Sequence, residues 1–176
     1  MIRYRFLLMA GLVLASLGLL AAAAQANSAP QPKNDPATQQ TINDVRSVGT
    51  AMWHWYKDQM ASRPPHEHAK PADPMTADFA PIPVISREDL AKVLVPRYIP
   101  AIPEKDGWGH PYEFRLSTQN LDADWMMAVR SPGKDGRFSG DSYKVFSFPP
   151  AEKERDITWI DGYFATWPDA KEHKGK

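Results

Sequence analysis

The pattern of apolar residues in the first half of the chain predicts one long amphipathic helix. Ile42, Val45, Val48, Gly49, Met52, Trp55 and Tyr56 recur at intervals that place them on one side of a helix. Asp35 can cap this helix, and Pro36 suits its first position. At Gly49 the missing side chain would let a neighbouring backbone approach the apolar face closely. A sheet or a second helix is needed to cover that face.

The second half of the chain has the pattern of short strands. Runs rich in aromatic and β-branched residues occur at YEFRL (112–116), WMMAVR (125–130), YKVFSF (143–148), DITWI (156–160) and YFATW (163–167). The pair Asp161-Gly162 lies between the last two runs and predicts a tight hairpin. Before these runs, a short helix is expected to begin after Ser86 and to stop near Pro96. The Ser86 hydroxyl can cap its start, and Asp89 can complete a capping box.

This order of elements predicts the fold class and the division of the chain. We expect an α+β domain in which one long N-terminal helix packs on a small antiparallel sheet of about 4–5 strands. The domain is expected over residues 37–170, with a flexible leader over 27–36 and a polar tail over 171–176. Residues 61–83 carry six prolines and little periodicity, which predicts a long surface loop.

Residues 1–26 have the pattern of an export signal peptide. Arg3 and Arg5 precede a long apolar run that closes on Ala24-Gln25-Ala26. An uncleaved anchor in the inner membrane is the alternative, because residues 6–24 are almost long enough to span a bilayer. We therefore expect an exported protein, periplasmic or extracellular, with no stable membrane span once the signal is cleaved.

Composition narrows the classes of function. The 21 lysines and arginines are balanced by 21 aspartates and glutamates and are interspersed with them, whereas a nucleic-acid partner needs a concentrated basic face. The chain contains no cysteine, which excludes disulfides, thiol catalysis and zinc–thiolate sites. Stability must therefore come from a core rich in tryptophan and tyrosine, or from a bound cation.

The loop SPGKDGRFSGD, residues 131–141, is the densest cluster of glycine and charge. It lacks the spacing of a phosphate-binding loop and of an EF-hand. Calcium could still bind if oxygens converge from Asp135, Asp141 and Asp156, because backbone carbonyls can complete the coordination shell. A solvated turn is the alternative interpretation, and composition by itself favours it.

Three other groups of residues leave further functions open. His66 and His68 could bind zinc if His54 or His110 folded alongside. Asp122 and Asp124 could serve a hydrolase, although a solvated turn explains them as well. The six tryptophans could form a platform for a glycan or peptide if several were exposed together. Their places in the helix stripe and in the strands favour core packing instead.

Four segments carry motifs in a recognisable order. TINDVRSVGTAMWHWYKDQ is followed by YIPAIPEKDGWGHPYEF, which contains D-x-W-G-x-P-Y, then by SPGKDGRFSGD and finally by RDITW. In this order the segments resemble the globular part of the major pseudopilin of bacterial type II secretion systems. The resemblance spans about residues 41–168 and is interrupted by the proline-rich segment 61–83.

The resemblance implies a metal site in the second half of the chain. In that family the D-G loop binds calcium, which stabilises the C-terminal part of the domain. Carried over to this chain, it implies Asp135 and Asp156 as carboxylate ligands, with Asp141 as a further candidate. Backbone carbonyls near Ser131 or Gly133 would complete the shell.

The resemblance also implies a role without catalysis, through protein contacts in secretion or envelope assembly. The N-terminus departs from the family, in which a glutamate at the fifth mature position lies on a retained membrane helix. Residues 1–26 contain no glutamate, so we expect the globular domain to be reused as a soluble exported protein. The alternative is a periplasmic module that binds a glycan or peptide through exposed aromatic residues.

Overall fold

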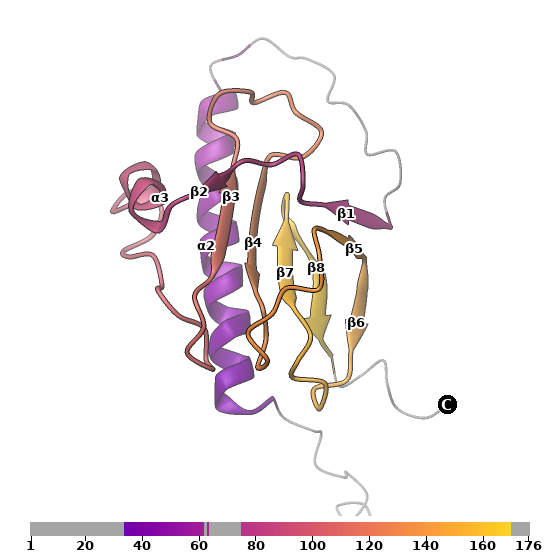
Figure 1. Cartoon of the computed structure of the whole chain (residues 1–176). Helices are drawn as coiled ribbons and strands as arrows, with labels where there is room; N and C mark the ends of the chain where they lie inside the picture. The colour runs from indigo at the N-terminus through magenta and orange to yellow at the C-terminus, as the bar shows by residue number, and fades with distance from the viewer. Residues whose placement is uncertain (1–33, 62, 64–74, 170–176) are drawn as a thin grey trace, which may run out of the picture. The chain divides into compact units, whose positions relative to one another are not determined.

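The structure is a computed structural model that describes residues 34–61, 63 and 75–169. Its elements are α2 (Pro36–Met60), β1 (Thr76–Asp78), β2 (Val84–Ile85), α3 (Arg87–Leu94), β3 (Glu113–Leu116), β4 (Met127–Ser131), β5 (Ser142–Lys144), β6 (Phe146–Phe148), β7 (Ile157–Ile160) and β8 (Tyr163–Pro168) (Figure 1). The α+β prediction is confirmed, with α2 as the one long helix of the described residues. The predicted signal peptide lies outside those residues, as do His66 and His68.

The described residues form more strands than the sequence predicted. Six strands form one sheet in the order β2-β3-β4-β7-β8-β6, and β1 pairs with β5 in a second sheet. All neighbouring strands are antiparallel except β6, which lies parallel to β8. The predicted number of strands is wrong because β1 and β2 have only three and two residues, too few to show a period. The expected strand over 143–148 is also divided at Val145 into β5 and β6.

The start of α2 confirms the predicted cap. The Asp35 carboxylate accepts hydrogen bonds from the backbone N–H groups of Ala37 and Thr38, at 3.1 and 3.2 Å. The Lys153 ammonium lies 3.0 Å from the same carboxylate. Burial raises the pKa of Asp35, but the bonds from Thr38 and Lys153 outweigh it and lower the pKa to about 2. The beginning of α2 is thus tied to the segment that precedes β7.

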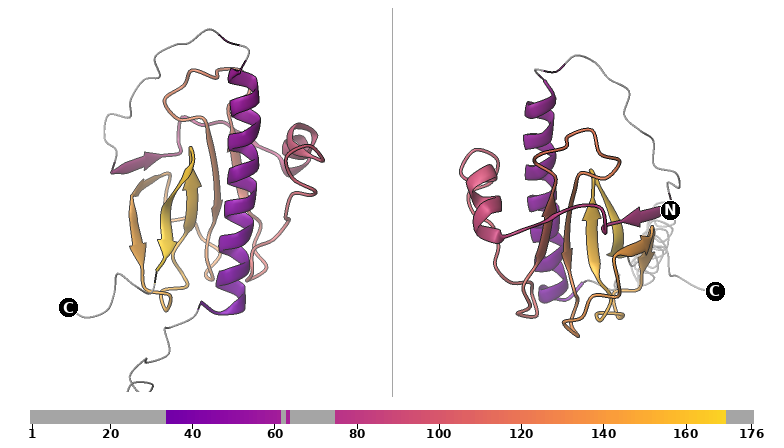
Figure 2. Two further views of the ribbon diagram at one scale, coloured as in Figure 1. Left: turned by 180° about the vertical axis from the view of Figure 1, so that it is seen from behind. Right: turned by 45° about the horizontal axis from the view of Figure 1, so that its top comes forward.

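α2 lies along one face of the six-stranded sheet (Figure 2, left). A Cβ atom built on Gly49 would lie 2.4 Å from Cδ2 of Trp159 on β7, far inside normal contact distance. Trp159 is itself only 4% exposed. The predicted close approach at Gly49 is confirmed, although the neighbour is the indole ring of Trp159 and not a backbone segment.

Both faces of the sheet centre carry a hydrophobic cluster. On β4, Met127 and Val129 belong to the cluster that includes α2, whereas Ala128 belongs to a second cluster. Because side chains alternate along a strand, the two clusters lie on opposite faces. The second cluster consists of Ala77, Phe79, Ile82, Ala128, Tyr143, Ile160 and Ala165. The segments around β1 and β5 therefore cover the face opposite α2.

The short helix α3 begins where its capping pattern predicted. The Ser86 hydroxyl accepts a hydrogen bond from the Asp89 backbone N–H at 3.0 Å and donates one to the Asp89 carboxylate at 2.8 Å. Leu90 and Leu94 are fully buried and join the cluster that contains the apolar side of α2. No helix of the described residues is long and apolar enough to span a membrane. The candidate anchor over residues 6–24 lies outside them.

The predicted hairpin between β7 and β8 is confirmed. Asp161 and Gly162 both have positive φ angles, of 43° and 108°, as the tight turns of hairpins require. The Asp161 carboxylate accepts hydrogen bonds from the backbone N–H groups of Met126 and Met127, at 3.1 and 2.9 Å. Burial nevertheless raises the pKa of Asp161 to about 6. The turn therefore contains an acid whose ionised form the fold disfavours.

We predict that Gly49→Ala destabilises the domain. Alanine would gain about 1 kcal/mol in helix propensity, but a methyl group 2.4 Å from the Trp159 ring forces the helix and sheet apart, at a cost of about 3 kcal/mol. Urea unfolding should show a net loss of about 2 kcal/mol. The control Thr50→Ala changes the next, exposed position of α2 and should cause no loss. Equal stability of Gly49→Ala and wild type would contradict the close contact.

A second prediction concerns pH and Asp161. Its pKa rises from 3.8 to about 6 on folding, so the stabilisation that this group contributes is complete below pH 3.8 and is lost as pH rises through 6. The loss amounts to about 3 kcal/mol at most. Asp161→Asn removes the titration and keeps an oxygen acceptor. Urea unfolding from pH 4 to 8 should therefore show the variant gaining stability relative to wild type, unlike the control Asp124→Asn at an exposed position. A difference that stays constant over this range would contradict the assignment.

Candidate functional site

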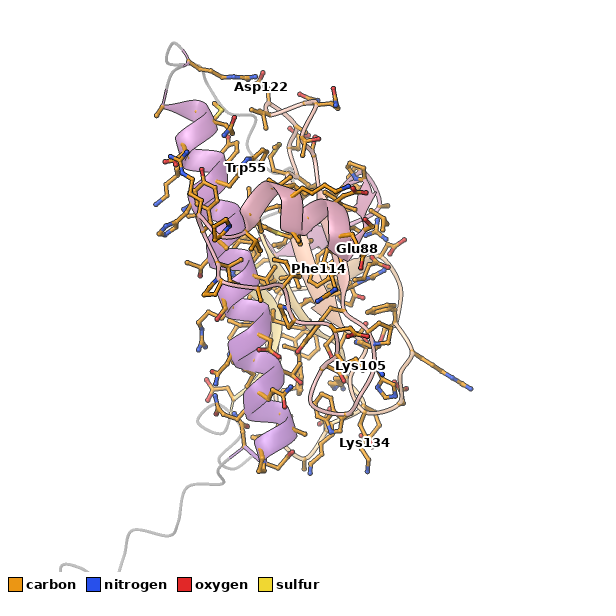
Figure 3. All side chains as sticks on the ribbon, turned by 90° about the vertical axis from the view of Figure 1, so that its left-hand side faces the viewer. Trp55, Glu88, Lys105, Phe114, Asp122 and Lys134 are labelled. Carbon is orange, nitrogen blue, oxygen red and sulfur yellow. The ribbon has the colours of Figure 1, made fainter. Side chains whose placement is uncertain are left out.

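Two loops that carry the sequence motifs lie against each other at the end of the domain where α2 begins. The first loop, residues 105–111, is closed by a bridge between Lys105 and Pro111. The second, residues 131–136, continues from β4. Figure 3 shows Lys105 and Lys134, one from each loop, near this end of α2. We call the contact between these two loops the loop junction.

The carboxylate of Asp106 is the centre of the loop junction. One oxygen accepts hydrogen bonds from the backbone N–H groups of Trp108 and His110, at 3.0 and 2.9 Å. The other accepts a hydrogen bond from the Ser131 hydroxyl at 2.6 Å. The Ser131 hydroxyl in turn accepts one from the Gly133 backbone N–H at 3.1 Å. Asp106 is only 3% exposed, so one buried carboxylate fixes the backbone of both loops.

His110 makes a second connection between the loops. Its Nδ1 atom lies 3.0 Å from the carbonyl oxygen of Gly133, where a protonated Nδ1 donates a hydrogen bond. Beyond this carbonyl, the Lys134 backbone N–H donates to the carbonyl oxygen of Lys153 at 2.8 Å. The second loop is thus held on one side by the first loop and on the other by the segment that leads into β7.

The first loop is also bound to α2. The Gly107 backbone N–H donates to the Thr41 hydroxyl at 3.0 Å, and the Tyr112 hydroxyl donates to the Asp44 carboxylate at 2.9 Å. Burial, followed by the charge of Asp44, raises the pKa of Tyr112. Tyr112 therefore stays a neutral hydrogen-bond donor at physiological pH. The helix, the two loops and the segment that leads into β7 form one connected unit.

The predicted metal ligands are distributed over this unit and its neighbourhood. Ser131 and Gly133 belong to the loop junction. Asp135 lies in the exposed end of the second loop, where its carboxylate accepts a hydrogen bond from the Arg137 backbone N–H at 3.0 Å. Asp156 is buried at the start of β7, and its Oδ2 accepts a hydrogen bond from the Ser139 backbone N–H at 2.8 Å. The structure thus brings Asp156 against the loop at Ser139.

Asp141, the remaining predicted ligand, lies among arginines. Its Oδ1 atom is 3.0 Å from a guanidinium nitrogen of Arg115 and 2.8 Å from one of Arg130. Both arginines are buried and also pair with Glu113. We call Glu113, Arg115, Arg130 and Asp141 the arginine cluster. Sequence reasoning missed it, although charged residues inside the apolar runs YEFRL and WMMAVR were a signal of buried ion pairs.

The predicted ligand oxygens differ in what they already bind. The Ser131 hydroxyl, the Gly133 carbonyl and Asp141 Oδ1 have partners within the protein. Asp156 Oδ1 is buried without a hydrogen-bond partner in the described part of the chain, and burial raises the pKa of this carboxyl. Within that part, no three histidine, aspartate or glutamate side chains are placed to hold a metal. Calcium at this loop stays a prediction.

The side chains that could serve catalysis, or stacking of a ligand on aromatic rings, have structural positions in the domain. The Ser131 side chain is fully buried and donates its proton to Asp106. Asp122 and Asp124 are exposed, and Asp122 pairs with Arg63 at 3.3 Å. All six tryptophans lie in described residues, and each is buried or partly buried. The tryptophans that belong to the hydrophobic clusters or pack against them are Trp53, Trp55, Trp108, Trp125 and Trp159.

Comparison of the chain with protein-family models, curated proteins and solved structures finds no match. The likeness to pseudopilins therefore depends on the sequence motifs alone.

We predict that Asp106→Ala strongly destabilises the domain. The substitution leaves two backbone N–H groups and the Ser131 hydroxyl without their acceptor, and such a loss costs about 3 kcal/mol in a buried site. Chemical denaturation should show this decrease, whereas the control Asp124→Ala at an exposed position should change stability by less than about 0.5 kcal/mol. Similar effects of the two substitutions would show that Asp106 does not hold the junction.

Proposed function

We propose that this chain is a non-enzymatic exported protein that acts through protein contacts in secretion or envelope assembly. The observation that carries the proposal is the loop junction. The motif segments that resemble the major pseudopilin are bound to one another through Asp106 and Ser131, through Gly107 and Thr41, and through Ser139 and Asp156. Their polar residues therefore serve to build one rigid domain.

The same geometry leaves these groups little scope for chemistry. A general base or nucleophile must reach its substrate within hydrogen-bond distance. Asp106 and Ser131 are 3% and 0% exposed, and their hydrogen-bonding atoms face each other. This arrangement supports a structural role for the conspicuous motif residues, in keeping with a protein that works by presenting a surface.

The tryptophans favour this proposal over a glycan- or peptide-binding module. An aromatic platform needs several rings exposed side by side. Trp159 is buried, and the other five tryptophans are partly buried. The large hydrophobic residues that are exposed among the described ones are Met75, Val84, Phe146 and Tyr163. The tryptophan side chains therefore lie mainly in the interior of the domain, where they can stabilise the core.

The proposal can be tested in the bacterium that makes the protein. Deleting the gene should cause a set of exported proteins to accumulate in the periplasm or to be lost from the medium, as measured by quantitative mass spectrometry of both fractions. Wild-type protein should restore their export, and a photo-crosslinker at exposed Tyr163 should capture an envelope protein. An unchanged set of exported proteins, together with saturable binding of a soluble glycan or peptide in calorimetry, would favour the alternative function.

A further inference from the structure

The segment 138–143 surrounds the guanidinium group of Arg130. One terminal nitrogen donates hydrogen bonds to the carbonyl oxygen of Gly140 and, at 2.8 Å, to the hydroxyl of Tyr143. The other donates to Asp141 Oδ1 at 2.8 Å. The Phe138 ring lies with its centroid 4.1 Å from the guanidinium carbon. Four residues of one short segment thus contact a single buried cation.

The remaining contacts of this guanidinium come from the sheet. Its Nε donates to Glu113 Oε1 at 3.0 Å, and a terminal nitrogen lies 2.8 Å from the same oxygen. Glu113 and Asp141 each bridge Arg115 and Arg130, so two positive charges meet two negative charges. Arg130 is only 4% exposed, and a buried charge is tolerated when it is paired and hydrogen-bonded in this way.

The contacts of Arg130 extend to the predicted metal ligand at the start of β7. The Tyr143 hydroxyl, which accepts from Arg130, lies 2.7 Å from both the Gly140 carbonyl and Asp156 Oδ2. Asp156 Oδ2 also accepts from the Ser139 backbone N–H. Carbonyl, carboxylate and hydroxyl oxygens therefore converge around the guanidinium in the region where the sequence predicted a cation.

We propose that the guanidinium of Arg130 is the cation that orders residues 138–143, and that this segment keeps its conformation without a divalent metal. A guanidinium presents five N–H donors in a rigid plane, which lets it bind several oxygens at fixed angles. Asp141 Oδ1 already accepts from both arginines, so calcium at this oxygen would compete with two guanidinium groups. The inference depends on the contacts of Arg130 and is independent of the proposed function.

Hydrogen exchange of the full chain, followed by mass spectrometry of peptides that cover residues 137–145, tests the proposal. Exchange in wild type should be the same with EGTA as with added calcium. Arg130→Lys keeps the charge but loses the planar set of donors, and should speed exchange in these peptides about tenfold. The matched control is Arg155→Lys, since Arg155 is exposed, pairs with Glu152 and lies over the ring of Phe146. It should leave exchange in this segment unchanged.

Two results would overturn the proposal. The first is faster exchange of wild type in EGTA that calcium reverses, which would assign the segment's order to the metal. The second is wild-type protection in Arg130→Lys. If that variant does not fold, Asp141→Asn at a half-exposed side chain replaces it. Faster exchange over 137–145 with unchanged exchange in β7 would support the proposal, and unchanged exchange in both segments would refute it.

Discussion

The arrangement of this domain depends on one buried carboxylate. Removing Asp106 from water is costly, and the cost is recovered because both of its oxygens accept hydrogen bonds from Trp108, His110 and Ser131. Those bonds set the path of the first loop and attach it to the end of β4. The first loop in turn binds α2 through Gly107. These hydrogen bonds therefore join α2, the first loop and the sheet at one end of the domain.

A second polar network lies on the other face of the sheet. Side chains alternate along a strand, so Arg130 points away from the α2 side that contains Val129. There it holds the segment between β4 and β5 through Gly140, Asp141 and Tyr143. The two networks attach the loops on both sides of the sheet end, one through an anion and the other through a cation. Because these charged side chains bind other parts of the fold, we propose that the protein functions through contacts at its surface.

Patterns within short stretches of the sequence predicted the features that depend on interactions between neighbouring residues. The cap at Asp35, the close approach at Gly49 and the turn at Asp161 are all confirmed, because each depends on neighbouring residues or on one helical face. The strands β1 and β2 could not be predicted, since a pattern of period two needs more residues than they contain. The parallel pairing of β6 with β8 is equally invisible in local patterns, because it joins segments across an intervening strand.

In the candidate site, too, features set by the pairing of distant strands could not be read from the sequence. Asp156 lies beside the 131–141 loop because both flank strands that pair with each other. Local patterns predicted no partner for Asp141, whose position depends on the register that sets Glu113 opposite Arg130. A register between distant strands follows from packing of the whole sheet and is not encoded in any one segment. The central role of Asp106 was hidden for the same reason, since this residue lies in a loop and its partner Ser131 lies at the end of β4.

The two-sided burial of the central strands also determines where another molecule can approach. Every residue of β4 and β7 is buried, so the middle of the sheet offers no free face. In the described part of the chain the sheet ends in β2 and β6, strands of two and three residues. Such short edge strands present few unpaired backbone N–H and C=O groups with which a strand of another molecule could pair. Short edge strands are one means by which sheet proteins avoid aggregation. The brevity that concealed these strands in the sequence thus leaves little edge to which another strand could pair.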